Sequence, residues 1–491
     1  MKLRHILYTA IVLLYCTSCN KWIDVKPTDR LSEDILFEKK EGFLKALNGV
    51  YVEMASTSLY GRFMTAGELD AMAQYYFITS STNSYYDYVM FNYTNANPKF
   101  GFDDAWRKAY ELNANVNVIL EKTGASPSSV LPEPYFGLIR GEALALRAML
   151  NFDMLRIFGP IWNDANKALK TIPYPIAAKS EIFPLLSSEE VMVQIERDLK
   201  EALTLLQNSD PILTEGVRNG NNPTGSSDLY YRQYRFNYFA VKALMARAAL
   251  WKGDKTNALK YAKDIIEDAK IQGKDIFPAV TAGDATSTAK PDRMFSTEVI
   301  FSLYTIKRSD LYNAIFAAEQ ADFNRLSVNA MNDDKARINA MYPNQADYRY
   351  RIWESVNAQN KQILTNQKFK DVVDGPGRYM IPLIRLGEIY LIAAEASNDL
   401  GEATGLLNTL RRRRNTTDIS PSDFSTLKTA ITEEFRRELF GEGQLFFYYK
   451  RNAFLNIPNN ASLVGEKSIS LNNYRVPLPE SEIKIRGGSQ P

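Results

Sequence analysis

The chain contains very little histidine and very little cysteine. Of its 491 residues, one is histidine, His5, and two are cysteine, Cys16 and Cys19. His5 and Cys16 lie within residues 1–18, which have the features of an export signal, so the mature chain keeps no histidine and a single cysteine. This composition excludes catalysis by Ser-His-Asp or Cys-His groups as usually built, zinc sites made from histidine or cysteine, and a disulfide within the chain.

The chain also lacks an excess of charge of either sign. Residues 1–18 hold two of the 59 Lys and Arg residues and none of the 57 Asp and Glu residues, which leaves 57 of each sign in the mature chain. A broad basic field for nucleic acid is therefore not expected. No later segment is apolar enough to cross a bilayer, and about 470 mature residues are enough to bury a large core.

The N-terminus predicts a lipoprotein signal. Lys2 and Arg4 precede a short apolar run, 6–15, and the small residues 17–18 directly precede Cys19. The apolar run is too short to span a bilayer, so we interpret residues 1–18 as a signal peptide and Cys19 as the lipidated first residue of the mature chain. The alternative is an ordinary secretory signal with Cys19 as a remaining thiol.

Three segments are expected in the chain. Residues 1–18 form the signal peptide, 19–31 a tether that Pro27 and scattered polar residues keep extended, and 32–491 one domain. Cys16 stands where such lipoprotein signals usually have leucine, and nothing in the sequence explains it.

Apolar residues recur every three or four positions in several segments, which predicts amphipathic helices. A first helix is expected to begin at Ser32 or Glu41 and to end at Met54. Two later stripes are Ile139, Ala143, Leu146, Leu150 and Met154, followed by Val191, Ile195, Leu199, Ala202 and Leu206. The segment Phe236–Trp251 is apolar nearly all round and is expected to be a central helix.

Two helix pairs share one layout. An alanine-rich helix, a short turn containing glycine (Gly253 or Gly401) and a second helix form a unit of about 34 residues, which is typical of a degenerate tetratricopeptide repeat. A chance likeness of two antiparallel helix pairs is the alternative. The predicted fold is mainly α, a tetratricopeptide-like scaffold of helix pairs with long irregular loop insertions.

Long stretches without a regular pattern separate these helices. They are residues 56–102, rich in Tyr, Ser, Thr and Asn, the turn-rich segment 208–230, and 272–380, which includes the strand-like run Val299–Leu303. Loops of this length in a compact protein usually carry function.

Short motifs follow one another along nearly the whole mature chain, from Cys19 to about Ile483. The motifs are Trp22–Pro27, Ala46–Tyr51, the trio Trp106, Tyr110 and Asn115, Arg140–Ala148 with Phe158–Pro160, Ala243–Leu250, Ile384–Leu391 with Ala394–Ala396, Leu410–Arg414, Glu434 with Arg437–Leu439, and Pro477–Ile483. Their order resembles that of the SusD/RagB family of outer-membrane nutrient-binding lipoproteins of Bacteroidetes.

This resemblance implies a binding protein on the cell surface, held in the outer membrane by a lipid on Cys19. Such proteins capture an oligosaccharide, or a peptide in some members, and deliver it to a partner TonB-dependent transporter of the SusC type. The helices face the transporter and the loops hold the ligand. No cofactor, no metal and no catalytic residue is implied, and no nucleic-acid partner is expected.

Sugar rings stack on aromatic side chains, and sugar hydroxyls pair with planar polar groups. By position, the resemblance places ligand contacts mainly in 56–102 and 272–380. The expected ligand-binding residues are Tyr60, Arg62, Asp70, Tyr75, Tyr76, Asn83, Tyr85, Tyr86 and Trp353, with Tyr348 and Tyr350 as weaker candidates. Trp106 and Trp251 are assigned to the core.

The charged residues of the motifs have structural interpretations. Arg140, Glu142 and Arg147 are expected to pair on or between helices, and the run Arg411–Arg414 to lie at a helix C-terminus, where cations are favoured.

Three other functions compete with glycan capture. A glycoside hydrolase needs only two carboxylates, but nothing in the sequence singles out a pair. A structural or adhesion protein built on helical repeats fits the long aromatic loops poorly. A peptide-binding member of the same family is hard to separate from a glycan-binding one, because Tyr, Asn and Asp serve both ligands.

Overall fold

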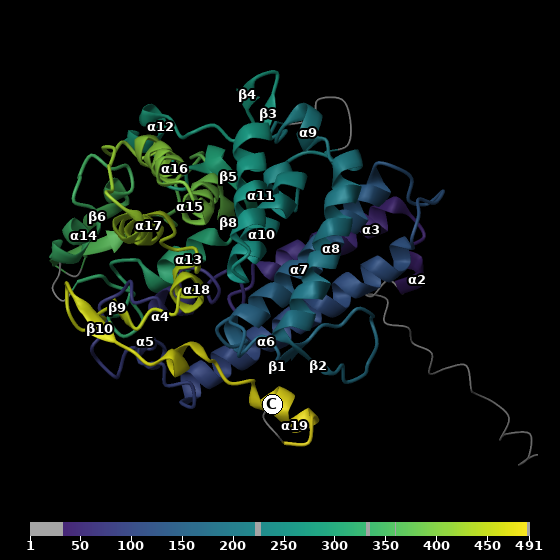
Figure 1. The fold of residues 1–491 in the computed structure, drawn as a ribbon, viewed down its shortest axis with the longest axis horizontal. Helices are drawn as coiled ribbons and strands as arrows, with labels where there is room; N and C mark the ends of the chain where they lie inside the picture. The colour runs from purple at the N-terminus through teal and green to yellow at the C-terminus, as the bar shows by residue number, and fades with distance from the viewer. Residues whose placement is uncertain (1–32, 221–226, 330–333, 359, 489–491) are drawn as a thin grey trace, which may run out of the picture.

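The computed structural model describes residues 33–220, 227–329, 334–358 and 360–488. The predicted signal peptide, Cys19 and the tether lie outside the described residues, as do 221–226 of the predicted loop 208–230. Helices dominate the architecture (Figure 1). In the part of the chain that is described, no helix is both long and apolar enough to cross a membrane.

Long helices form the first half of the scaffold. They are α3 (Lys40–Met54), α6 (Ala96–Thr123), α7 (Tyr135–Phe158) and α8 (Ser188–Ser209), preceded by the short α2 (Glu33–Leu36). The first long helix ends at Met54 as predicted. Helix α8 begins with a capping box between Ser187 and Glu190, and its predicted apolar stripe is buried against α7.

The two predicted helix pairs are α10 (Tyr238–Trp251) with α11 (Lys255–Asp268), and α15 (Leu386–Ala396) with α16 (Leu400–Arg413). Helix α11 packs against α15, so the two pairs stack as neighbouring units. Asp254 and Asp399 take equivalent positions, because each accepts a hydrogen bond from the first turn of the second helix in its pair, at 3.1 and 2.7 Å. The repeated capping supports true repeats.

The glycines of the two pairs differ from expectation. Gly253 lies in the first turn with φ +80°, as a turn glycine should. Gly401 lies inside α16, and the second turn is 397–399, which contains no glycine. The prediction that Gly401 forms the second turn is therefore wrong, because Asp399 begins the helix before Gly401 is reached.

The loop insertions carry short elements. The described strands form two-stranded antiparallel sheets, which are β1 (Lys170–Pro173) with β2 (Leu185–Ser187), β3 (Lys270–Ile271) with β4 (Lys274–Asp275), β5 (Val299–Tyr304) with β8 (Met380–Arg385), β6 (Trp353–Ala358) with β7 (Lys361–Asn366), and β9 (Asn456–Pro458) with β10 (Glu466–Ser468). The predicted strand at Val299–Leu303 is confirmed in β5, where Leu303 pairs with Ile381.

The remaining helices are short, apart from α17. They are α4 (Glu68–Met72), α5 (Tyr86–Val89), α9 (Ile212–Glu215), α12 (Ala282–Thr286), α13 (Arg308–Ile315), α14 (Ala336–Met341), α17 (Phe424–Glu438), α18 (Leu445–Arg451) and α19 (Glu480–Ile485), with 3₁₀ turns at Arg232–Tyr234, Ser296–Glu298, Tyr350–Ile352 and Leu471–Tyr474.

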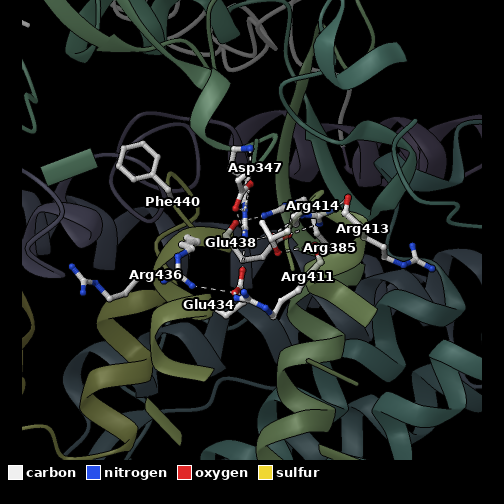
Figure 2. Close-up of polar contacts among 12 residues, drawn as sticks. Asp347, Arg385, Arg411, Arg413, Arg414, Glu434, Arg436, Glu438 and Phe440 are labelled. Atoms are coloured by element: carbon white, nitrogen blue, oxygen red, sulfur yellow. Dashed lines mark hydrogen bonds and ion pairs between the residues drawn. The ribbon is translucent and has the colours of Figure 1, made fainter. Parts of the chain in front are cut away.

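A buried network of charges joins the loop insertions to the helical scaffold (Figure 2). Arg414, directly after α16, donates to Glu298 at 2.7 and 2.8 Å and to Glu438 at 2.6 and 2.8 Å. Arg385 at the end of β8 and Arg349 also donate to Glu438, at 2.7 and 2.9 Å. Although burial opposes ionisation, the guanidinium groups of Arg414 and Arg385 hold the pKa of Glu438 well below its usual value.

The arginine run lies at the C-terminus of α16, as predicted, but its members differ in environment. Arg411 pairs with Glu434 at 2.9 Å, and Arg412 is exposed and lies 3.5 Å from Asp418. Arg414 is fully buried. The helix dipole therefore accounts for only part of this cluster, and Arg414 is a core residue.

The predicted structural role of the Arg140–Ala148 motif is confirmed. Arg147 forms a bidentate pair with Asp198 of α8 at 2.6 and 2.9 Å, and Arg140 pairs with Glu201 of the same helix at 2.8 Å. Glu142 accepts from Arg232 at 2.7 Å. Each partner comes from another element, so these pairs connect helices rather than residues within the motif.

Candidate ligand-binding site

Two segments far apart in the sequence meet at one surface of the loop insertions. The backbone N–H of Phe77 donates to the carbonyl of Ser327 at 2.7 Å, and that of Ser84 donates to the carbonyl of Phe323 at 2.8 Å. The first segment belongs to loop region 56–102, and the second to the other long loop region. Both regions that the sequence singled out therefore contribute to one structure.

A cavity of about 330 Å³ lies between these segments, and we call it the loop groove. Its lining combines hydroxyl, amide and charged groups with a few apolar side chains. The lining residues are Phe77, Ile78, Thr79, Ser80, Thr82, Asn83, Asp322, Phe323, Arg325, Ser327, Asn329 and Ile363. Its size falls at the lower end of the range of about 300–1,000 Å³ that is usual for small-molecule sites.

The polar side chains of the loop groove are held in place by local hydrogen bonds. The Asn83 side chain accepts from the backbone N–H of Tyr85 at 2.9 Å and donates to the carbonyl of Asp322 at 3.1 Å. Arg325 pairs with the exposed carboxylate of Asp322, and it also donates to two backbone carbonyls of its own loop at 2.9 and 3.0 Å. These groups are therefore oriented before any ligand arrives.

Phe323 is the aromatic side chain that the loop groove presents to solvent. It is 53% exposed, whereas Phe77 is half-buried and Ile78 and Ile363 are buried. An exposed ring beside fixed amide and hydroxyl groups is suited to a ligand that has both an apolar face and many hydroxyl groups.

Few charged side chains line the loop groove. Among its described lining residues, Asp322 is the single carboxylate and Arg325 the single cation. In the described ranges of the chain, no group of three His, Cys, Asp or Glu residues is placed to hold a metal ion. The arrangement is suited to binding a neutral polar ligand by stacking and hydrogen bonds.

Of the nine residues expected to bind ligand, Asn83 lies in the loop groove. Three tyrosines are buried, and each hydroxyl already has a partner inside the protein. Tyr60 donates to Asp153 at 2.7 Å, Tyr76 to the carbonyl of Ala66 at 2.7 Å, and Tyr75 to the carbonyl of Arg436 at 2.8 Å. Burial raises the pKa of all three hydroxyl groups well above the ordinary value. The structure therefore gives these rings a packing role.

Three more of the expected residues are also buried. Asp70 accepts the backbone N–H groups of Gly441 and Gly443, at 2.6 and 3.0 Å, and burial raises its pKa well above the usual value. Tyr85 is buried near the groove, and the ring of Trp353 lies edge-on, 4.9 Å from that of Phe440. Asp70 therefore fixes a tight backbone turn, and the two aromatic rings contribute to packing.

Arg62 and Tyr86 are half-buried and outside the loop groove. Arg62 pairs with Glu68 at 3.0 Å, and Tyr86 packs against the hydrophobic core. The weaker candidates Tyr348 and Tyr350 are half-buried as well. Among the expected set, the geometry therefore favours Asn83.

Sequence reasoning did not select Phe323, Asp322 or Arg325. They occur in one short run of the 272–380 region, in which the sequence predicts Trp353 as the contributor. A signal was present, because an aromatic residue stands there between polar residues without any helical or alternating pattern. Tryptophan was a poor guide here, because the Trp353 ring is buried and packs against Phe440.

Comparisons with known proteins place this geometry in context. A family model described as "SusD family" matches residues 219–484, and one described as "Starch-binding associating with outer membrane" matches residues 21–214. A comparison with the curated proteins gives no match.

Solved structures share the fold over nearly the whole chain. A SusD superfamily protein from Bacteroides thetaiotaomicron VPI-5482 is 23% identical, with 92% of this chain and 99% of that chain covered and a TM-score of 0.70. A SusD-like carbohydrate binding protein from Bacteroides vulgatus ATCC 8482 is 20% identical, with 92% and 97% covered and a TM-score of 0.66. Together with a family match over more than half of the sequence, this likeness confirms the resemblance read from the motifs, and the chain belongs to the SusD family.

Proposed function

We propose that this protein is a cell-surface lipoprotein that captures an oligosaccharide in the loop groove and delivers it to a TonB-dependent transporter of the SusC type. The observation that carries the proposal is the exposed ring of Phe323 beside fixed amide, hydroxyl and carboxylate groups, on the loop insertions of a SusD fold. The description of one matching family, starch-binding and associated with the outer membrane, supports both the ligand class and the location.

The loop groove meets the physical needs of sugar recognition. The Phe323 ring offers a flat apolar surface for the C–H face of a sugar ring. The side chains of Asn83, Thr82 and Asp322 offer donors and acceptors to hydroxyl groups, and Arg325 keeps the Asp322 carboxylate oriented. Because these groups are already held by the protein, little ordering cost remains for binding.

Glycan binding is tested by substitution of Phe323. A glycan array of neutral oligosaccharides with the purified mature chain identifies a ligand, and calorimetry then measures its affinity. Phe323→Ala is expected to weaken binding by about two- to tenfold through loss of stacking. Melting should stay unchanged, because the Phe323 ring is 53% exposed.

Phe100 supplies a matched control. Its ring is 69% exposed near the start of α6 and does not line the groove. Phe100→Ala should bind as the unchanged protein does. Equal affinities for Phe323→Ala and Phe100→Ala would show that the ligand binds elsewhere.

A peptide is the competing ligand, because amides and carboxylates also pair with peptide backbone groups. Binding of unstructured peptides in place of glycans, lost in Phe323→Ala, would keep the site and change the ligand class. Hydrolysis is not proposed, since glycoside cleavage uses two carboxylates and Asp322 is the one carboxylate among the described residues of the groove.

The lipid anchor and the transporter are the remaining parts of the proposal. Cys19 is the proposed attachment point, and Cys19→Ser should move the protein from the membrane fraction to the soluble fraction. Purification of the lipidated protein from its native membrane should bring a SusC-type barrel with it. A protein that stays in the membrane without Cys19, or that purifies alone, would contradict these two parts.

A further inference from the structure

A second and larger cavity lies in the helical scaffold, and we call it the scaffold cavity. Its volume is about 730 Å³, and it shares no lining residue with the loop groove. Many of its lining residues come from the turns of the two stacked helix pairs, from α17 and from the end of α18. Lys252 and Gly253 come from the first turn, and Ser397 and Asn398 from the second.

Three aromatic side chains from separate elements line this cavity. Trp162 follows α7, Trp251 ends α10, and Phe424 begins α17. Trp251 is buried as predicted for a core residue, Trp162 is half-buried, and Phe424 at the mouth is 49% exposed. The half-buried Trp162 ring and the exposed Phe424 ring offer flat apolar surfaces for ring-shaped ligands, and the buried Trp251 lies in the wall between them and the core.

Planar polar groups lie beside these rings. Arg451 and Glu395 form a bidentate pair at 2.7 and 2.8 Å in the wall of the cavity. The amides of Asn163 and Asn398 lie at its exposed edge. Guanidinium, carboxylate and amide groups are the planar partners that sugar hydroxyl groups prefer.

The charge at the mouth is positive. Lys255 and Lys428 line the cavity, and neither forms an ion pair with any residue that the structure describes. The other charged groups of the lining are balanced, since Lys252 pairs with Glu196 and Asp164 with a neighbouring lysine. Two cations are thus left to attract an anion.

We propose that the scaffold cavity is a second binding site, specific for an oligosaccharide that carries carboxylate or sulfate groups. Its volume lies within the range of about 300–1,000 Å³ usual for ligand sites. The rings of Trp162 and Phe424 would stack on the sugar faces, and Lys255 and Lys428 would bind the acidic groups. An acidic peptide fits less well, because helices and their turns line the cavity and offer no strand edge for an extended backbone.

Tryptophan fluorescence isolates this site from the loop groove. Trp162 and Trp251 line the scaffold cavity, whereas no tryptophan is among the described residues that line the loop groove. The probes are tetrasaccharides of galacturonic acid, hyaluronan and chondroitin sulfate. The methyl ester of the galacturonic acid tetramer and a tetraglutamate peptide serve as neutral and peptide controls.

At least one acidic tetrasaccharide should change the tryptophan emission in a saturable way, with affinity at least about tenfold above that of the neutral ester. Lys255→Gln with Lys428→Gln should weaken this binding and reduce its salt dependence. Because both lysines are exposed, the fold should persist. Lys45→Gln, an exposed lysine of α3, is the control that should leave binding unchanged.

Three outcomes would overturn the proposal: no emission change with any acidic tetrasaccharide, equal binding of the neutral ester, or equal binding of tetraglutamate. Phe323→Ala is expected to leave this response intact. A failure of the loop groove to bind neutral glycans is therefore a separate result from a failure of the scaffold cavity to bind acidic ones.

Discussion

Arg414→Gln and Arg412→Gln are expected to differ strongly in their effect on stability, although the two residues stand in the same arginine run. Arg414 is fully buried and makes four charge-assisted hydrogen bonds of 2.6–2.8 Å to Glu298 and Glu438. The Arg412 side chain is 60% exposed and lies 3.5 Å from Asp418. The same chemical change thus removes a buried pair in one variant and a surface pair in the other.

The magnitude follows from what remains after each change. Glu438 keeps Arg385 and Arg349, but among the described residues Arg414 is the sole ion-pair partner of Glu298. Removing one partner of a buried pair leaves a charge without compensation, which costs about 3–5 kcal/mol. The surface pair of Arg412 is worth about 0–1 kcal/mol, because water screens it.

Urea unfolding of the mature chain, followed by circular dichroism, measures both effects. Arg414→Gln should lower the free energy of unfolding by about 3–5 kcal/mol with an unchanged denaturant slope. The double variant with Glu298→Gln should lose less than the sum of the two single variants, because the second change removes the stranded carboxylate. A loss below about 1 kcal/mol for Arg414→Gln, similar to that of Arg412→Gln, would refute a stabilising role for the network.

Two further predictions concern other buried polar side chains. Tyr76→Ala should lower the free energy of unfolding by about 3–5 kcal/mol, because it removes a buried ring whose hydroxyl donates to the carbonyl of Ala66. Calorimetric melting measures this loss. An unchanged melting temperature together with weaker ligand binding would instead place Tyr76 in the binding site. The Lys450 amine is buried against the carbonyls of Ile157 and Gly159, and this burial, with repulsion from Arg156 and Arg475, lowers its pKa well below 10.5. At pH values between the folded pKa of Lys450 and 10.5, the unfolded chain binds one more proton than the folded chain. The contribution of this group to the free energy of unfolding therefore increases as pH rises toward 10.5, and it is lost as pH falls through the folded pKa. Lys450→Met should remove that dependence, and an identical pH profile of the urea midpoint in the variant and the unchanged protein would contradict it.

Local patterns in the sequence were enough to predict much of the scaffold. The stripe from Val191 to Leu206 has a helical period, and it is buried along one face of α8. Trp106 and Trp251 were assigned to the core, and both are buried. These predictions hold because an amphipathic period is a property of neighbouring residues, and a helix that has one must bury its apolar face.

The residues of the proposed binding site were less predictable. Tyr75, Tyr76 and Trp353 have the chemistry of sugar-binding residues, but Phe440 packs against all three rings. That contact joins positions far apart in the chain, so composition and spacing do not contain it. Residue type thus predicts the aromatic and polar chemistry of the proposed site, but it does not predict where on the folded chain that site lies.

The sequence by itself determined the helical class, the stacked pairs, the two loop regions that meet at the groove and the membership of the SusD family. Only the tertiary structure decided which members of a motif are buried, since Arg414 is buried whereas Arg412 in the same run is exposed. It also decided that the Phe323 ring faces solvent. It also produced the scaffold cavity, whose rings come from three separate elements. The physical reason is that periodicity and propensity act between neighbours, whereas burial and ion pairing depend on contacts that only the folded chain creates.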